Sequence, residues 1–100
     1  MRTQPCDSEI REGRLRKAGS FMDAASIIHE FADQEETIAD VYVTLCVHAG
    51  IAASDVICCV NIGEHAKGES HSDAVELLKK VDKDAAKDLS ALLNLKTKSG

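Results

Sequence analysis

Two ionisable residues in the most apolar stretch of the chain have the type and spacing to act on a ligand. His48 and Asp55 lie seven residues apart within the segment from Thr37 to Ile62. On a helix this spacing places them on one side, two turns and about 10 Å apart. They cannot touch, but a substrate or partner group could bridge them, because histidine titrates near neutrality and aspartate is a fixed anion.

The same helix side carries further polar residues, namely Thr37, Asp40 and Thr44. Such a stripe is either the solvated edge of a mostly buried helix, since charged side chains normally stay in water, or a surface that faces a partner or cleft. We therefore name His48 and Asp55 as candidate binding residues. They carry no recognisable catalytic motif.

A zinc site is the second chemistry that the sequence raises. Cys59, His65 and His71 follow one another with five residues between each pair. The usual C-x-x-C knuckle is absent, and buried cysteines that act as small apolar side chains are commoner than ligands. We expect no metal and no cofactor.

The four cysteines also bear on the compartment. The N-terminus is polar and is not followed by an apolar run, so no signal peptide is recognisable. The cytoplasm is therefore the expected location, and the cysteines are expected to be reduced thiols. Cys6 and Cys46 have no partner that the sequence reveals, and a Cys–His nucleophile is not expected because His48 lies ten residues before Cys58.

Four cations lie close together near the N-terminus, at Arg11, Arg14, Arg16 and Lys17. They could contact an anion or RNA, or they could form a solvated face. The chain as a whole is acidic, with a net charge of −5. This balance argues against unspecific nucleic-acid binding, which requires many lysines and arginines, but it leaves room for a local basic patch.

The elements that position these residues are expected to be helices, because apolar residues recur at three- and four-residue spacing. We predict an all-α fold, an antiparallel four-helix up-and-down bundle. Residues 1–7 are expected to be a disordered N-terminal tail and residues 8–100 a single domain, with helices at about 8–32, 37–62, 70–81 and 84–97. The apolar face of the first helix is predicted to be Leu15, Ala18, Phe21, Met22, Ala25, Ile28 and Phe31 or Ala32. That of the second is Ile38, Val41, Tyr42, Leu45, Ala49, Ala52, Val56, Cys59 and Val60. The third presents Ala74, Val75, Leu77, Leu78 and Val81, and the fourth Leu89, Leu92, Leu93 and Leu95.

Capping residues and a small-residue patch add detail. The predicted caps of the first, third and fourth helices are Asp7 or Ser8, Ser70 or Ser72, and Asp82 or Asp84. Thr37 is predicted to cap the second helix and Gly63 to end it. The patch from Ala49 to Ser54 predicts tight helix packing.

The second helix is long enough to cross a membrane, but Asp55 would cost about 2.5–3.5 kcal/mol near its centre, so no membrane span is expected.

From His48 to Leu78 the sequence reads HAGIAASDVICCVNIGEHAKGESHSDAVELL and resembles small bacterial helical proteins of the HEPN class (higher eukaryotes and prokaryotes nucleotide-binding). The resembling positions are Ala49 to Cys59, followed by His71, Asp73, Ala74, Val75, Leu77 and Leu78. The resemblance implies an antiparallel bundle of four or five helices, often a dimer. It also implies that Asp55 lines the cleft.

Many HEPN proteins are metal-independent ribonucleases with an Arg and a His placed late in the bundle, and others are RNA-binding or partner modules beside nucleotidyltransferases. In this subgroup a Lys-x-x-Ala-His-Tyr-like stretch follows the fourth helix. Here the stretch reads Lys96, Thr97, Lys98, Ser99, Gly100, in which Lys96 alone matches and becomes the third candidate binding residue.

The resemblance therefore leads us to expect a non-catalytic HEPN-like module for protein–protein or RNA interaction. Its setting would be beside a nucleotidyltransferase or in a toxin–antitoxin system, and its partner a second copy, a nucleotidyltransferase-like protein or RNA. One alternative is a metal-independent ribonuclease that is truncated here, with its catalytic His beyond Gly100. Another is an unrelated helical adaptor.

Overall fold

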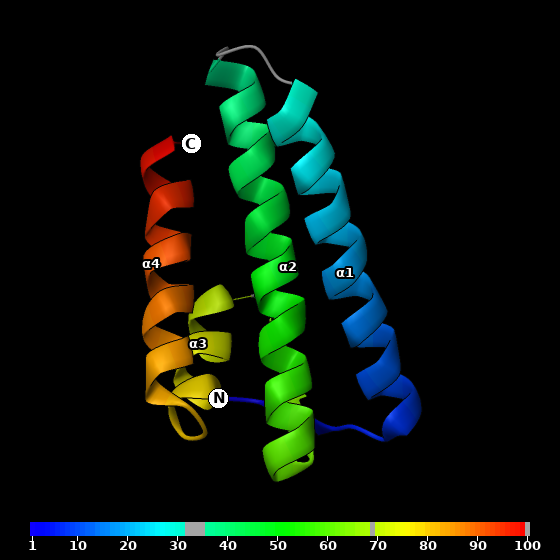
Figure 1. The fold of residues 1–100 in the computed structure, drawn as a ribbon. Coiled ribbons are helices and arrows are strands. Elements are labelled where there is room, and N and C mark those ends of the chain that lie inside the picture. Colours follow the sequence, from blue (N-terminus) through cyan, green and yellow to red (C-terminus); the bar gives the residue numbers. More distant parts are fainter. Residues whose placement is uncertain (32–35, 69, 100) are drawn as a thin grey trace.

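The computed structural model describes residues 1–31, 36–68 and 70–99, and these form four helices and one small sheet (Figure 1). The elements in chain order are β1 (Thr3–Pro5), α1 (Ser8–Phe31), α2 (Glu36–Ile62), β2 (Glu64–Ala66), α3 (His71–Lys79) and α4 (Lys83–Ser99). The predicted helices are confirmed, with ends that differ by one or two residues; residue 32, the predicted end of the first helix, lies outside the described residues. The sheet was not predicted.

The helix ends follow from local chemistry. Asp7 caps α1, because its Oδ1 accepts a hydrogen bond from the backbone N–H of Ile10 at 2.9 Å. Asp82 caps α4 in the same way, accepting from the N–H of Ala85 at 3.0 Å. α2 ends at Ile62, and the next residue, Gly63, has a φ of 72°, the left-handed conformation expected of a helix terminator.

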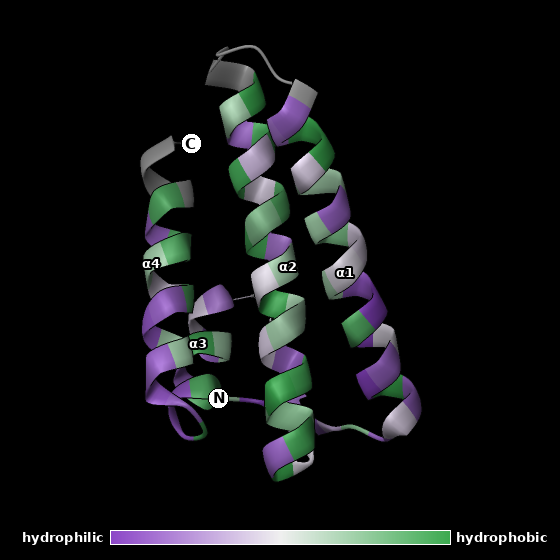
Figure 2. Cartoon of the chain, in the orientation of Figure 1, coloured by the Kyte–Doolittle hydropathy of each residue, from purple (hydrophilic) through white to green (hydrophobic). Residues whose placement is uncertain are grey.

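α2 is the central element of the fold. It lies between α1 and α4 in Figure 1, and α1 packs mainly on α2 while α4 packs on α2 and α3. Figure 2 shows α2 as the most continuously apolar helix. The buried core lies where the last turns of α2 meet α3 and α4, and it comprises Cys58, Ala74, Leu77, Leu78, Ala86 and Leu89. Burial of each leucine stabilises the fold by about 1.5–3 kcal/mol.

The predicted apolar faces are only partly buried. The face of α3 is confirmed, and Ala25 of α1 is fully buried. Leu15 and Met22 of α1, however, are 60% and 46% exposed, because α1 packs mainly on α2 and only a narrow stripe is covered. Val41 and Val60 of α2 and Leu95 of α4 were also wrongly placed in the core, because their side chains are exposed.

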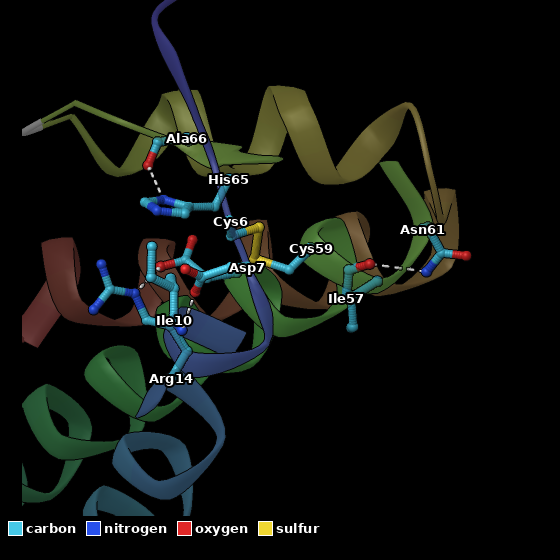
Figure 3. The surroundings of a disulfide bond; sticks show 10 residues. Cys6, Asp7, Ile10, Arg14, Ile57, Cys59, Asn61, His65 and Ala66 are labelled. Carbon is cyan, nitrogen blue, oxygen red and sulfur yellow. Dashed lines mark hydrogen bonds and ion pairs between the residues drawn. A yellow bond between two sulfur atoms is a disulfide. The ribbon is translucent and has the colours of Figure 1, made fainter. Parts of the chain in front are cut away.

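The N-terminal segment is ordered, which corrects the prediction of a disordered tail. β1 pairs antiparallel with β2, in the register Thr3 to Ala66, Gln4 to His65 and Pro5 to Glu64. Immediately after β1, Cys6 forms a disulfide with Cys59 of α2, the two Cα atoms being 5.8 Å apart (Figure 3). The expectation of four reduced thiols is therefore wrong for this pair, while Cys46 and Cys58 are free.

Within α2, the stretch Ile38–Ile62 is long and apolar enough to cross a membrane by length and composition. A core helix meets the same criteria, and this stretch is partly buried against α1, α3 and α4. The expectation that no membrane is involved stays a prediction.

The small-residue patch of α2 allows close packing by α4, as predicted. A Cβ added at Gly50 would lie 3.1 Å from Leu92 Cδ2 and 3.2 Å from Leu89 Cδ1. We therefore expect Gly50→Val to lower the free energy of unfolding by about 2–3 kcal/mol through overpacking, measured by urea denaturation. Gly19→Val is the matched control, because nothing lies within 4 Å of that position. Equal effects of the two substitutions would contradict the close packing.

Candidate anion-binding pocket

A pocket of about 410 Å³ opens where α1, the second half of α2, the small sheet and the start of α3 meet. Its lining comes from segments that are far apart in the sequence. The lining residues are Arg2, Gln4, Arg14, Lys17, Phe21, His48, Ile51, Ala52, Asp55, His65, Ala66, Lys67, Gly68, Ser70, His71 and Ala74. Both ionisable residues predicted from α2 are among them.

The lining is basic, in contrast to the chain as a whole. Four cations line the pocket, Arg2, Arg14, Lys17 and Lys67, against one carboxylate among the described lining residues, Asp55. The formal balance of the lining is therefore four minus one, or +3 with neutral histidines, whereas the whole chain carries −5. A concave site with this sign attracts anions locally.

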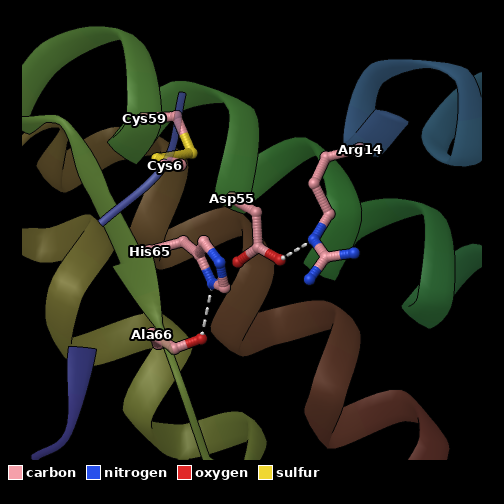
Figure 4. A network of polar contacts seen from close by, with 6 residues as sticks. All are labelled: Cys6, Arg14, Asp55, Cys59, His65 and Ala66. Carbon is pink, nitrogen blue, oxygen red and sulfur yellow. Dashed lines mark hydrogen bonds and ion pairs between the residues drawn. A yellow bond between two sulfur atoms is a disulfide. The ribbon is translucent and has the colours of Figure 1, made fainter. Parts of the chain in front are cut away.

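The carboxylate of Asp55 is held by an ion pair at the pocket wall (Figure 4). Arg14 Nε donates to Asp55 Oδ2 at 3.1 Å, and Asp55 is 8% exposed. Burial raises the pKa of Asp55 above its ordinary value of 3.8, while the nearby His65, Arg14 and Lys17 oppose the rise. Because Arg14 keeps a partly exposed guanidinium, an incoming anion could share it with Asp55.

His65 is almost fully buried, at 4% exposure, and β2 fixes its position. Its Nδ1 lies 2.9 Å from the carbonyl oxygen of Ala66, so we assign the proton to Nδ1. Figure 4 shows the ring beside the carboxylate of Asp55. The backbone contact leaves Nε2 as the ring nitrogen with capacity for a second partner.

An aromatic pair forms another part of the lining. The rings of Phe21 and His48 stack, with centroids 5.1 Å apart and an interplanar angle of 21°. Phe21 is half-buried and His48 is exposed, so the pair lies at the rim of the pocket. Flat rings at this position offer a face on which a planar group could stack.

The structure brings some predicted site residues together and leaves others apart. His48 and Asp55 line the same pocket, as do Arg14 and Lys17 of the predicted cation cluster. Lys96 lies in α4, and its side chain falls outside the described residues.

The zinc ligand set considered from the sequence does not form. Cys59 is bonded to Cys6, so it offers no thiolate. In the part of the chain that the structure describes, no three His, Cys, Asp or Glu residues gather as they would around a metal ion.

Among the lining residues that carry a charged or amide side chain, the sequence analysis missed Arg2, Gln4 and Lys67. Each lies in or next to the unpredicted sheet. Arg2 and Lys67 are isolated cations in segments that the sequence analysis assigned to a tail and a loop, so no local pattern pointed to them.

Comparison of the chain with family models, with curated proteins and with solved structures found no match.

The pKa of Asp55 predicts how stability depends on pH. A folded-state pKa above the ordinary value means that the folded protein binds this proton more tightly than the unfolded chain, so stability is lost as pH rises from about 4 through the folded pKa. Asp55→Asn cannot ionise. We therefore expect it to gain stability relative to the wild type as pH rises from about 3.5 to 7, in urea denaturation at a series of pH values.

The control is Asp88→Asn, which removes the same charge from an exposed position on α4. A relative stability of Asp55→Asn that fell with rising pH would show that the Arg14 ion pair outweighs burial.

Proposed function

We propose that the chain is a non-catalytic, HEPN-like helical module that binds RNA through the basic pocket. The observation that carries the proposal is the concentration of four cations and one carboxylate in one concavity of an acidic protein. RNA phosphates are recognised by such local positive charge, and an acidic surround confines binding to the pocket.

The residue types of the lining, cations beside aromatic rings, support a single-stranded ligand. Arg14 and Lys17 would contact a phosphate, and the stacked rings of Phe21 and His48 would provide a face for an unstacked base. Single-stranded RNA is commonly held by this combination of a basic groove and an aromatic platform.

The proposal extends to assembly and location. A homodimer, or pairing with a nucleotidyltransferase-like protein in a toxin–antitoxin setting, is supported by large apolar side chains that are exposed on α1 and α2, such as Leu15, Ile27 and Val60. We propose the cytoplasm as the compartment, where RNA is available. Light scattering of the purified protein tests the dimer, and a monomeric mass would contradict it.

The experiment for RNA binding uses a fluorescein-labelled single-stranded oligoribonucleotide and fluorescence anisotropy at two salt concentrations. We expect Lys17→Gln to weaken binding about five- to tenfold and to lower the salt dependence by about one ion contact. Lys87→Gln on α4 is the matched control, because it removes the same charge away from this pocket. Equal effects of both substitutions, or no binding by the wild type, would contradict the proposal and favour an unrelated helical adaptor.

A second candidate function, metal-independent ribonuclease, is favoured by one observation: His48, His65 and His71 line the same pocket as the cations. Histidine beside a bound phosphodiester is the usual general acid or base of such cleavage. Incubation of the same oligonucleotide with protein and chelator, followed by separation of the products, decides between binding and cleavage.

A further inference from the structure

The N-terminal segment is joined to the rest of the fold by one covalent bond. Cys6 follows β1 directly and is bonded to Cys59, 53 residues later, near the end of α2 (Figure 3). Asp55, which pairs with Arg14 in the pocket, lies one helical turn before Cys59, and Figure 4 shows the disulfide near this ion pair. The bond therefore lies close to the pocket without lining it.

The non-covalent contacts that hold this segment are few. β1 and β2 pair over three residues, and two backbone hydrogen bonds flank them: Cys6 N–H to Gly63 O at 3.0 Å and Lys67 N–H to Arg2 O at 2.9 Å. No residue before Ala25 belongs to the fully buried apolar set of the described chain. A two-stranded ladder on its own is at best marginally stable in water, and here it is β2 that packs against the core, through Ala66.

The same segment supplies part of the pocket. Arg2 and Gln4 line it, and Arg2 is one of its four cations. β1 also pairs with the strand that carries His65, opposite Gln4. Release of the segment would remove one cation from the lining and would leave β2 without its partner strand.

We propose that the Cys6–Cys59 disulfide is a redox-sensitive latch that completes the anion-binding pocket: its reduction releases the segment from Arg2 to Pro5 and weakens binding. The inference rests on the proposed anion-binding function of the pocket. In a cytoplasmic protein a disulfide is usually transient, because cellular thiols reduce it, so such a bond suits a sensor better than a permanent brace.

The exchange reaction is balanced by a dithiol reductant. One thiolate of the reductant attacks the sulfur of Cys6, because Cys6 is half-buried whereas Cys59 is only 7% exposed. Cys59 then leaves as a thiolate and takes up a proton. The second thiol of the reductant then attacks the mixed disulfide and releases Cys6 as a thiol. Two electrons pass to the protein, and the reductant departs as its own disulfide.

The two free thiols, Cys46 and Cys58, are poorly placed for this exchange. Cys58 is 1% exposed, and burial together with the nearby Asp55 raises the pKa of its thiol, which disfavours the reactive thiolate. Cys46 lies three helical turns away from Cys58 along α2. Cys46 therefore serves as the control cysteine.

The test compares the oxidised and dithiothreitol-reduced full chain in the same RNA-binding assay, with free thiols counted by mass spectrometry. We expect reduction to weaken binding about five- to tenfold. A Cys6→Ser/Cys59→Ser variant is expected to bind like the reduced protein in both conditions, whereas Cys46→Ala keeps the response to reductant. An unchanged affinity after verified reduction would overturn the latch.

Arg2→Gln separates the latch from a general loss of structure. It should weaken binding of the oxidised protein, but it should have no further effect on the reduced protein, in which Arg2 has already left the pocket. Equal effects of Arg2→Gln in both redox states would overturn the proposal.

If the oxidised protein bound no RNA, the proposed function would fail, and hydrogen exchange would still test the latch. Reduction should speed exchange of the Lys67 amide, which donates to Arg2 O, and should leave the amides of α3 protected. Unchanged protection of Lys67 would show that β1 stays in place.

Discussion

Asp55→Asn is expected to tighten RNA binding about tenfold, whereas Arg14→Gln is expected to weaken it about tenfold. Both changes act on one contact, the 3.1 Å ion pair between Arg14 Nε and Asp55 Oδ2. A phosphate must compete with Asp55 for the guanidinium, and the carboxylate repels the phosphate as well. A charged hydrogen bond contributes about 1.5–3 kcal/mol, and 1.4 kcal/mol corresponds to a factor of ten in affinity.

The opposite signs make this pair of variants informative. If Arg14 and Asp55 served only to hold α1 against α2, both substitutions would weaken binding through loss of structure. Asp88→Asn on the exposed face of α4 controls for the change in net charge and is expected to alter affinity by less than about twofold. Thermal unfolding followed by circular dichroism verifies that every variant is folded at the assay temperature.

Removal of the disulfide is expected to have the largest effect on stability. The bond closes a loop with a sequence separation of 53, for which loss of the loop constraint in the unfolded chain corresponds to about 4 kcal/mol. Measured losses commonly lie between about 2 and 4 kcal/mol. We therefore expect Cys6→Ser/Cys59→Ser to lower Tm by about 10–20 °C, in calorimetry of a chain of this size.

Reduction of the wild type should lower Tm by the same amount, and Cys46→Ala, which removes a free thiol, should leave the reductant response intact. A loss below the full value of about 4 kcal/mol would agree with release of β1 on reduction, since the freed strand then gains entropy in the native state as well as in the unfolded chain. A Tm that did not change with verified reduction would contradict a constraining role for the bond.

The helices were predictable because their signals are local. Apolar spacing, the caps at Asp7 and Asp82, and the left-handed Gly63 each depend on residues within one or two turns. The core of α3 was predictable for the same reason, since Leu77 and Leu78 lie on one strongly apolar face. Leu15 and Met22 were misplaced because spacing identifies an apolar face and gives no sign of how many neighbours will cover it.

The sheet and the disulfide could not be predicted from local sequence signals. Thr3–Pro5 and Glu64–Ala66 are three residues each and carry no alternation of apolar and polar residues, so neither reads as a strand. Pairing between Cys6 and Cys59 depends on the meeting of distant segments, and cysteine spacing alone does not fix connectivity.

Part of the candidate pocket could therefore be predicted from the sequence. His48 and Asp55 were identified because they share a side of one helix, and Arg14 and Lys17 because they belong to one dense run of charge. Arg2 and Lys67 become partners of these residues only through the strand pairing. Local patterns thus revealed the part of the pocket that lies on α1 and α2.

The wide separation of the pocket residues bears on the order in which the protein takes shape. α1 and α2 are neighbours in sequence, and their contacts can form early, since closing a short connection is fast and entropically favourable. Thr3 meets Ala66 only after both long helices and the turn at Gly63 are in place. During synthesis Thr3 leaves the ribosome long before its partner Ala66, and the pairing of β1 with β2 is expected to open first in local unfolding.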